Sequence, residues 1–461
     1  MMLSPEALAP ERFPRFKPYA EYRETRAAWL GAAPAGWNER RLRASVSTCQ
    51  NGIWGDEPDG INDVICMRVS DFDRGALRVH MSNPTIRSIP PGDHPKRLLA
   101  HGDLLLEKSG GGERQPVGAV VLYDWDVPAV CSNFIARMTV APGYQPGFLA
   151  YLHATLYSAR VNTKSIKQST GIQNLDSDSY LDEVVCFPSL NEQRAIADFL
   201  DRETAKIDTL VARKQRLIEL LQEKRAALIT RAVTRGLDPD VPLRDSGVPW
   251  LGSVPAHWRV RRLKFAARLE SGHTPNREVS EYWENCTIPW ISLNDVSYLA
   301  AHDYAYETVN YINELGLAHS SARMLPPGTV VLSRDATIGR CAILGKSMAT
   351  SQHFVNWVCR PEMLPEYLLL VFRGPMQQEF ERLTMGATLR TIGMPDVKSF
   401  VAPVPPVAEQ RAIVDSAHEG ASAIDRLTER VREGIERLRE YRAALITAAV
   451  TGKIDVRGEV V

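Results

Sequence analysis

Two long segments of the chain carry apolar residues seven positions apart, set among charged residues. The first segment has Leu200, Ile207, Leu221 and Leu228, and the second has Ile424, Val431, Leu438 and Leu445. An apolar residue every seven positions is typical of a coiled-coil helix. A proline precedes each segment and a glycine follows it, which agrees with the usual signals for helix start and stop. The pattern therefore predicts two long helices, from about 190 to 236 and from 407 onward.

A second set of large residues occupies the partner heptad position, three residues after the first position, and predicts the other half of the seam. These residues are Leu210, Leu217, Leu427 and Tyr441. The predicted helix-to-helix contacts are Ile207, Leu210, Leu221 and Leu228 in one helix, and Ile424, Leu427, Leu438 and Leu445 in the other. Roughly 44 helical residues make a rod of about 66 Å, longer than an ordinary core helix. The alternative is a pair of helices buried in ordinary domain cores.

The same two segments are copies of one another. Residues 190–238 and 407–455 are identical at 24 of 49 positions when shifted by 217. A second repeat relates WLGAAPAGWNERRLR at 29–43 to WLGSVPAHWRVRRLK at 250–264, with 9 of 15 positions identical at a shift of 221. The chain is therefore one unit written twice, and pseudo-twofold symmetry predicts that the two helices pair in antiparallel orientation.

The stretches between the repeats share little sequence. Short β-like runs at 103–107, 117–123, 133–140, 329–333 and 341–344 alternate with glycine and proline, and helical stretches at 146–159 and 365–383 follow them. Two mixed bodies of α/β or α+β class, about 44–188 and 265–405, fit this pattern.

Composition and charge exclude several classes of protein. The chain has 461 residues, is 44% hydrophobic, and balances 55 basic against 55 acidic residues. Disordered and disulfide-rich proteins are excluded, and so is a chain that coats DNA through overall positive charge, although a local basic groove is not. No apolar run is long enough to cross a membrane, and the N-terminus lacks the features of a secretory signal. Seven scattered cysteines without a C-x-x-C pair predict reduced thiols in the cytoplasm and no zinc site.

Catalytic motifs are missing from the sequence. Residues 339–347 (GRCAILGKS) resemble a phosphate-binding loop, but five residues rather than four separate the two glycines. Motifs for methyl-donor binding, G-x-S-x-G and H-E-x-x-H are also lacking, so we expect no active site and no cofactor in this chain.

Basic and amide side chains on glycine-rich loops are the candidate binding residues. In the first body they are Lys108, Ser109, Arg114, Gln115, Lys164, Lys167, Gln168, Gln173 and Asn174. In the second they are Arg334, Thr337, Arg340, Gln352, Thr388 and Arg390. Arginine and lysine bind phosphates or guanine, and glutamine and asparagine suit adenine. Any one of these residues could belong to a solvated loop, but their recurrence at matched places in both halves predicts DNA contact.

The twofold order of these motifs resembles the specificity subunit of type I restriction-modification enzymes. The matching motifs are W-L-G-x-x-P-x-x-W at 29–37 and 250–258, E-Q-R-A-I followed by a heptad helix ending in R-A-A-L-I-T, K-S-G-G-G at 108–112, and S-R-D-A-T-I-G at 333–339. The resemblance covers the chain beyond about residue 17. Residues 1–16 are an extension of unknown use.

The resemblance implies a domain plan and a set of partners. It predicts an N-terminal extension and frame segment at 1–28, target recognition domains at 29–189 and 237–406, and repeated helices at 190–236 and 407–461. Each recognition domain would read half of a split double-stranded DNA target, and the antiparallel coiled coil would set the spacing. Two modification subunits would supply S-adenosylmethionine chemistry, and restriction subunits would supply the steps that need ATP and Mg²⁺. The specificity subunit of a fused methylase-nuclease system and a coiled-coil scaffold that does not bind DNA are the alternatives.

Overall fold

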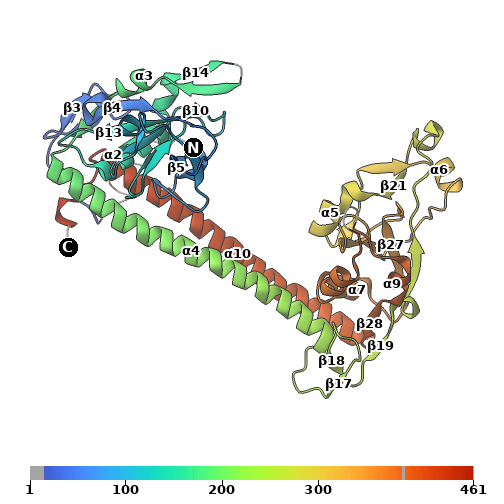
Figure 1. Cartoon of the computed structure of the whole chain (residues 1–461). Coiled ribbons are helices and arrows are strands. Elements are labelled where there is room, and N and C mark those ends of the chain that lie inside the picture. The colour runs from blue at the N-terminus through green and yellow to red at the C-terminus, as the bar shows by residue number, and fades with distance from the viewer. Residues whose placement is uncertain (1–14, 170, 387–389, 460–461) are drawn as a thin grey trace. The chain divides into compact units, whose positions relative to one another are not determined.

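The computed structural model describes residues 15–169, 171–386 and 390–459. They form two compact units: unit 1 takes residues 1–213 and 433–461, and unit 2 takes residues 214–432. The ribbon runs from β1 (Tyr22–Glu24) to the long helix α10 (Val407–Val450) and a short turn beyond it (Figure 1). Among the described residues, none of the helices combines the length and apolar character that a membrane span requires.

Unit 1 is built on a six-stranded mixed sheet. Its strand order is β4 (Val46–Asn51), β13 (Ile135–Val140), β9 (Leu104–Glu107), β11 (Val120–Leu122), β7 (Arg78–Val79) and β6 (Phe72–Asp73). The central strand β9 is buried on both faces: Leu104 and Leu106 belong to the main core, and Leu105 to a second core. Burial on both faces explains why this strand is a continuous apolar run rather than an alternating one.

Smaller elements complete unit 1. A three-stranded sheet has the order β12 (Ala129–Cys131), β5 (Asp63–Met67), β8 (Thr85–Ser88). Two-stranded sheets join β1 to β2 (Ala32–Pro34) and β3 (Asn38–Arg41) to β16 (Val184–Phe187). The helices are α1 (His94–Arg97), α2 (Pro146–Ser158), α3 (Ser177–Leu181) and the first part of α4 (Leu190–Arg235).

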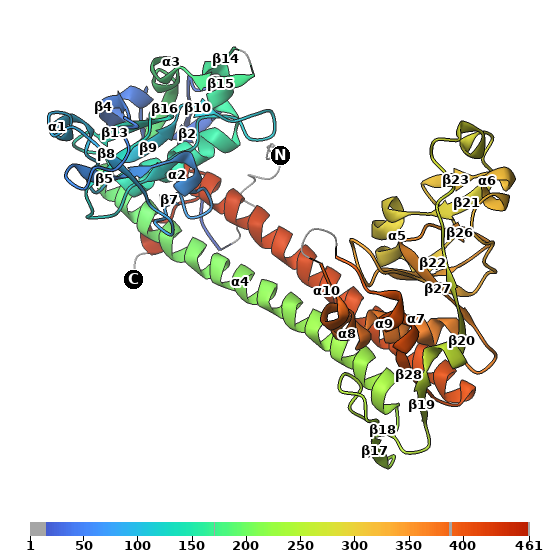
Figure 2. The ribbon, with the colours of Figure 1, turned by 45° about the vertical axis from the view of Figure 1, so that its right-hand side comes forward.

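Unit 2 repeats this topology with a different sequence (Figure 2). Its main sheet has the order β20 (Ala267–Ser271), β27 (Phe354–Cys359), β24 (Thr329–Ser333), β25 (Cys341–Leu344), β22 (Tyr304–Ala305). Neighbouring strands of this sheet are antiparallel except β25 and β22, which are parallel. The first five strands of the unit 1 sheet have the same orientations, with β11 and β7 as the parallel pair. A sheet of β26 (Ala349–Thr350), β21 (Ile288–Ile291) and β23 (Asn310–Ile312) matches β12, β5 and β8. Two bodies of unrelated sequence therefore share one scaffold.

The remaining elements of unit 2 follow the same plan. Two-stranded sheets join β17 (Leu243–Asp245) to β18 (Ser253–Pro255) and β19 (Arg259–Arg262) to β28 (Val401–Val404). The helices are α5 (Val296–Ala301), α6 (Glu314–Ala318), α7 (Pro365–Arg373), α8 (Met376–Leu383) and α9 (Met394–Ser399). The sequence predicts one helix over 365–383, but α7 and α8 are separate. The break lies at Gly374 and Pro375, because proline cannot donate the hydrogen bond that would continue α7.

The long helices α4 and α10 are confirmed, and their pairing is antiparallel in each unit. In unit 1 the Arg442 guanidinium in α10 pairs with Asp208 in α4, with Nε 3.0 Å from Oδ1. In unit 2, Arg225 in α4 pairs with Asp425 in α10 at 3.1 Å. A shift of 217 converts Asp208 into Asp425 and Arg225 into Arg442, so the two ion pairs are copies related by the repeat.

The seam between the helices differs from the prediction at half of its positions. The first predicted set is confirmed, because Ile207, Leu221, Ile424 and Leu445 are buried and Leu228 and Leu438 pack against the cores. The second set is wrong: Leu210, Leu217, Leu427 and Tyr441 are each more than 40% exposed. The buried flank instead carries residues four positions after the first set, including Thr428 and Ile435 of α10. Several of these are smaller or more polar than the exposed leucines, so residue type pointed to the wrong flank of the helix.

A glycine inside α10 also has a packing role. Glycine is a poor helix former, yet α10 runs through Gly420 without a break. A Cβ atom at this position would lie 2.8 Å from Cδ1 of Leu228, so the missing side chain makes room for a seam leucine of α4.

The repeated tryptophans explain the first sequence repeat. In unit 1 the Trp37 indole Nε1 donates to Glu192 at 3.1 Å, and in unit 2 the Trp258 indole Nε1 donates to Glu409 at 2.7 Å. Each indole also lies against the glycine that ends the other long helix. A Cβ atom on Gly452 or Gly236 would be 3.2 Å from Trp37 or Trp258, respectively. Each tryptophan thus joins the start of one long helix to the end of the other.

The repeated glutamines explain the E-Q-R-A-I motif. The Gln193 side chain accepts from the Gln145 backbone N–H at the start of α2, and its amide donates to the Pro188 carbonyl. The Gln410 side chain accepts from the Leu364 N–H at the start of α7 and donates to the carbonyls of Glu362 and Pro405. Both glutamines are buried. Each one therefore fastens its recognition body to a long helix.

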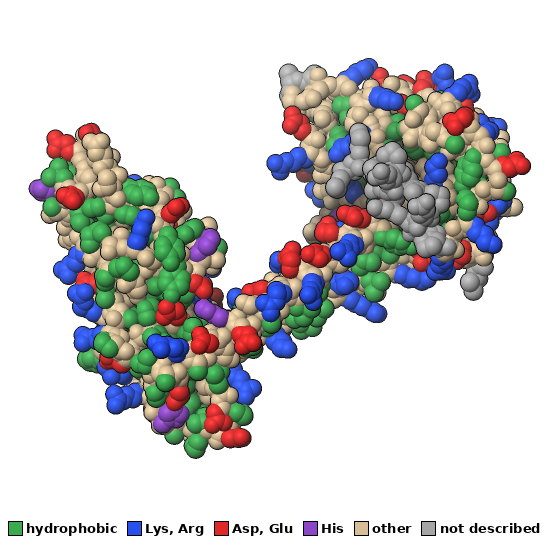
Figure 3. All heavy atoms as spheres, turned by 180° about the vertical axis from the view of Figure 1, so that it is seen from behind, with side chains coloured by type: hydrophobic (Ala, Val, Ile, Leu, Met, Phe, Trp, Pro, Cys, Tyr) green, Lys and Arg blue, Asp and Glu red, His purple; other side chains and the backbone are tan. Residues whose placement is uncertain are grey.

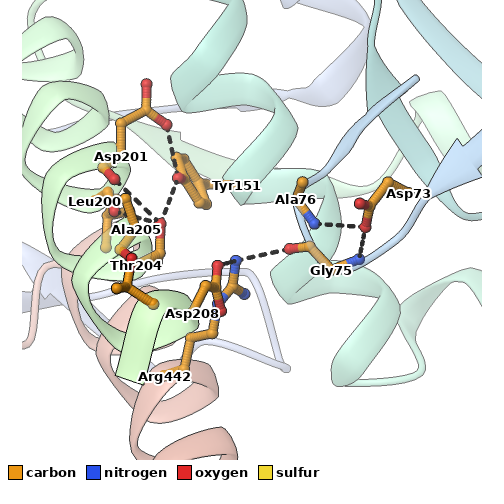
Figure 4. A network of polar contacts seen from close by, with 11 residues as sticks. Asp73, Gly75, Ala76, Tyr151, Leu200, Asp201, Thr204, Ala205, Asp208 and Arg442 are labelled. Carbon is orange, nitrogen blue, oxygen red and sulfur yellow. Dashed lines mark hydrogen bonds and ion pairs between the residues drawn. The ribbon is translucent and has the colours of Figure 1, made fainter. Parts of the chain in front are cut away.

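Further polar contacts hold α4 and α10 to the body of unit 1 (Figure 4). The Tyr151 hydroxyl of α2 donates to Asp201 at 2.7 Å, and the Arg442 guanidinium donates to the Gly75 carbonyl at 2.7 Å. The N-terminal segment joins the same frame, because Phe16 packs edge-on against Phe199 and the Tyr19 hydroxyl donates to Glu192.

Replacing Gln410 with alanine is expected to destabilise unit 2. The change leaves one buried N–H and two carbonyls without their partner, and we expect a loss of about 3 kcal/mol in the free energy of unfolding. Urea denaturation followed by tryptophan fluorescence measures it. The matched control is Gln115→Ala, an exposed glutamine in unit 1, which should change stability little. Equal effects of the two variants would contradict the fastening role of Gln410.

Candidate nucleic-acid interface

In unit 1, three separate predicted segments come together in one small sheet. Its order is β10 (Ser109–Gly110), β15 (Ile172–Leu175), β14 (Ile166–Ser169). Asn174 lies opposite Ser109 on one side and Lys167 on the other. Because residues directly opposite in antiparallel strands point to the same face, Ser109, Lys167 and Asn174 share one face of this sheet.

The side chains on this face are already ordered by neighbours. The Ser109 hydroxyl donates to the Asn174 amide oxygen at 2.6 Å. The Lys167 ammonium donates to Asp176 at 2.7 Å, which raises the pKa of Lys167 and lowers that of Asp176. Both groups are solvent-accessible, so the lysine remains charged and can exchange Asp176 for a phosphate.

Lys108, next to Ser109, connects this sheet to the segment of Asn51 at the end of β4. Its ammonium donates to the side-chain oxygen of Asn51 at 2.6 Å, and the Arg97 guanidinium donates to the Asn51 carbonyl. Asn51 and Arg97 were not among the sequence candidates. The Asn51–Gly52 dipeptide at the end of β4 is a turn signal that could have pointed to Asn51.

The other unit 1 candidates differ in their exposure. Arg114, Gln115, Lys164 and Gln168 are exposed. The Gln115 amide faces the Arg74 guanidinium, which also donates to the buried Glu107 carboxylate at 2.9 Å. Burial raises the pKa of Glu107 even though Arg74 opposes that shift. Gln173 is buried, and its amide oxygen accepts from the Val117 N–H at 3.3 Å, so it supports the sheet from within.

In unit 2 the loop after β24 meets the loop before α9. The Arg334 guanidinium donates to the Ile392 carbonyl at 3.0 Å and to the Gln352 carbonyl at 3.4 Å. The Ala336 N–H donates to the Arg390 carbonyl at 2.8 Å. The Arg334 side chain is 22% exposed and largely occupied with backbone carbonyls, so it holds the loops together more than it faces solvent.

Asp335 is the centre of this arrangement, and it was not among the sequence candidates. It is buried, and its carboxylate accepts from the Thr391 hydroxyl and lies 3.0 Å from Nδ1 of His353. The Arg334 guanidinium lies 3.6 Å away. One carboxylate thus joins three segments of unit 2. A buried acid beside an arginine in a polar loop is the signal that could have found it.

The remaining unit 2 candidates surround this centre. Thr337, Arg340, Gln352 and Arg390 are exposed. The Gln352 amide oxygen accepts from the Thr274 hydroxyl. The predicted contact Thr388 lies outside the described residues.

One backbone contact recurs in both units and shows that the two sites are equivalent. In unit 1 the Leu175 N–H donates to the Lys108 carbonyl at 2.7 Å, and in unit 2 the Ile392 N–H donates to the Arg334 carbonyl at 2.9 Å. The same two segments therefore meet at the same place on the scaffold. The side chains that they carry differ, with lysine and amides in unit 1 and arginines in unit 2.

The side chains at these two sites are of the kinds that bind a ligand. Within the described ranges, no group of three or more His, Cys, Asp or Glu side chains could hold a metal ion. The His353–Asp335 pair resembles the orienting half of a catalytic triad, but Asp335 also binds Thr391 and Arg334, which gives the pair a bracing role. Positive and amide groups on rigidly held loops suit phosphate and base edges.

Comparison with known proteins found a family model and relatives that match this chain. Residues 255–437 match the family model of the type I restriction modification DNA specificity domain. The MjaIX type I specificity subunit of Methanocaldococcus jannaschii is 30% identical over 166 residues, which cover 35% of this chain and 38% of that relative. The putative MjaX type I specificity subunit of the same organism is 19% identical over 93% of this chain and 96% of its own length.

A solved structure has the same fold. It comes from work described as the structural basis of complex assembly and conformational transition of the type I R-M system. Its TM-score is 0.67 at 17% identity, and the match covers 91% of this chain and 98% of that one.

Proposed function

The chain belongs to the family of type I restriction-modification specificity subunits, and on that premise we propose that each unit reads one half of a split DNA target. The observation that carries this proposal is the repeat of one scaffold with different polar side chains at the same place. Identical sites would read identical half-sites. Because Lys108, Ser109 and Lys167 in unit 1 stand where Arg334 and Arg390 stand in unit 2, the two half-sites should differ and the whole target should be asymmetric.

We assign the chemistry of the complex to partner chains. Modification subunits would bring S-adenosylmethionine, and restriction subunits would bring ATP and Mg²⁺, in the cytoplasm where the DNA lies. The role of this chain would then be to bind without catalysing. Its balanced net charge fits this division of labour, because a neutral protein gains little from non-specific attraction to phosphates.

The decisive test is methylated-base mapping across the genome of a host that expresses this chain with its methylase. We expect a split, asymmetric methylated motif that disappears when the gene for this chain is disrupted in frame. The methylase alone serves as the control. A motif that survives the disruption would contradict the proposal and favour the scaffold alternative.

A base-reading contact in either unit should affect only its own half-site, whereas a phosphate contact should affect binding to every sequence. Lys167→Ala should weaken binding to every sequence and lower the salt slope of log K by about one, as loss of one phosphate contact requires. Gln168→Ala and Arg390→Ala, if these side chains read bases, should cost roughly 1–3 kcal/mol and relax one position each. The positions should lie in opposite half-sites. Electrophoretic binding assays with single-base variants of the motif measure both effects.

The control for these variants is Lys398→Ala, which removes an exposed charge from α9 of unit 2. It should leave both the salt slope and the motif unchanged. Relaxation in the wrong half-site would contradict the assignment of units to half-sites.

The two exposed leucines related by the repeat suggest where the modification subunits bind. Leu210 in unit 1 is 45% exposed and Leu427 in unit 2 is 44% exposed. Green apolar patches are visible along the helical region in Figure 3. Contiguous exposed apolar surface is typical of partner interfaces, and we propose that each leucine belongs to one. Two equivalent surfaces would bind two modification subunits.

Single and double variants test this stoichiometry. Leu210→Glu should reduce the bound modification subunits from two to one, and adding Leu427→Glu should remove both and abolish methylation. The mass of the purified complex gives the number of bound modification subunits directly. Thr209→Glu, on the neighbouring exposed position, is the control. A double variant that still binds two subunits would refute these surfaces.

The helix pair should set the spacer between half-sites. A seven-residue insertion in both α4 and α10 preserves the seam and adds about 10 Å of helix, which corresponds to about three base pairs. We expect the methylated motif to keep both half-sites and gain three spacer positions. The same insertion in one helix alone should abolish methylation, because the seam residues no longer match. An unchanged spacer in the double insertion would contradict the proposal.

A further inference from the structure

Unit 2 contains a cavity beside its loop cluster that the contacts described so far do not use. Its volume is about 490 Å³, which lies within the range of ligand pockets. Trp283, Trp290, Asn294, Asn310, Ser351 and Arg277 are among the residues that line it. No acidic side chain is among its lining residues in the described part of the chain.

The aromatic wall of the cavity presents apolar ring surface. The Trp290 indole N–H donates to the His273 carbonyl, and the Trp283 indole N–H donates to the Asn276 carbonyl, each at 3.1 Å. The rings meet edge to face, with centroids 5.6 Å apart. Trp290 is only 2% exposed and supports Trp283 from within, whereas Trp283 is half-buried, so its ring offers stacking and van der Waals contact to a ligand.

The polar wall holds a hydroxyl that lacks a partner. Ser351 is 1% exposed, and its Oγ is buried without a hydrogen bond in the structure. A buried polar group without a partner costs free energy, which a ligand could recover. Nearby, the Asn310 amide is fixed because its Nδ2 donates to the Ser292 hydroxyl at 2.8 Å, and Asn294 is exposed at the rim.

The cavity adjoins the loop cluster that we assign to DNA. His353 lines it and also pairs with Asp335. The Arg334 N–H donates to the His353 carbonyl at 2.9 Å. Arg277 is exposed at the cavity and supplies the positive charge that a phosphate would need.

We propose that this cavity receives one unstacked base of the DNA bound by unit 2. The base would stack or pack against Trp283 and Trp290, its edge would hydrogen-bond to Ser351 and to the asparagine amides, and Arg277 would bind the adjacent phosphate. A planar ring with a hydrogen-bonding edge and a nearby negative charge matches this combination of groups. A base inside an intact duplex exposes only its edges in the grooves, so the ring surface is useful only if the base leaves the stack. The inference rests on the proposed DNA-binding function.

Base-analogue fluorescence tests the proposal on the full chain bound to its modification subunits. The probe is a duplex that carries the mapped methylated motif. 2-Aminopurine replaces each adenine in turn and pyrrolocytosine replaces each cytosine, while permanganate reports on thymines. We expect one position, or one base pair, in the unit 2 half-site to unstack on binding, and none in the unit 1 half-site except a base withdrawn for methylation by the partner.

Variants of residues that line the cavity test whether the unstacking signal depends on the cavity. Trp283→Ala should weaken binding to the duplex by roughly tenfold, as loss of one stacked base does, and should abolish the unit 2 signal. Trp283→Phe should retain both, and Ser351→Ala should reduce the signal with less effect on the fold than a tryptophan change. Trp125→Ala, an exposed tryptophan in unit 1, is the matched control and should change neither reading.

The outcomes distinguish failure of this inference from failure of the proposed function. Specific binding with every unit 2 base stacked, or a signal unchanged by Trp283→Ala and Ser351→Ala, would overturn the inference alone. Quenching of tryptophan fluorescence by a free mononucleotide, with all duplex bases still stacked, would also overturn the inference. The cavity would then be a binding site for free nucleotides. A wild-type complex without sequence-specific binding would overturn the proposed function itself.

Discussion

The main hydrophobic core of each unit is closed by a helix end that is distant in the chain. The core of unit 1 includes Ile196 and Leu200 from the start of α4 together with Leu445 and Val450 from the end of α10. The core of unit 2 combines Ile229 and Val233 with Ile413 and Val414. Bringing such distant segments together costs loop-closure entropy, and burial of the repeated helix ends must offset it. The frame repeat therefore has a structural purpose: the same side chains complete both cores.

The tryptophan, glutamate and glutamine of the repeated motifs act at these closures. Trp258 binds Glu409 at the start of α10 and covers Gly236 at the end of α4. Gln410 fastens α7 to the same helix start. These buried polar contacts are directional, so they specify which helix end joins which body as well as adding stability. A core made only of leucines would tolerate more than one arrangement.

The scaffold separates what must stay the same from what can change. The five central strands of each unit share order and orientation, and the backbone contact between the two polar loops is retained. The side chains at that contact are free to differ. Unit 1 extends it into the strands β10, β14 and β15, whereas unit 2 uses isolated bridges and the buried Asp335. Rigidity is therefore achieved by backbone pairing in one unit and by a carboxylate in the other, and either solution holds polar side chains ready for a charged ligand.

Local pattern was enough for the sequence to determine the two long helices, the apolar strands and the internal repeat. The helix α4 (Leu190–Arg235) and the strands β24 and β25 lie where periodicity and apolar runs predicted them, because each depends on residues close together in the chain. The tertiary structure alone decided which flank of each helix forms the seam. In α10, Thr428 is buried while the neighbouring Leu427 is 44% exposed, since the direction from which the partner helix approaches cannot be read from one helix alone. It also decided that Gln173 supports the sheet from within, that Asp335 joins three segments, and that Trp283 and Trp290 line one cavity with Ser351. Those relations depend on contacts between segments far apart in the chain, which local sequence does not encode.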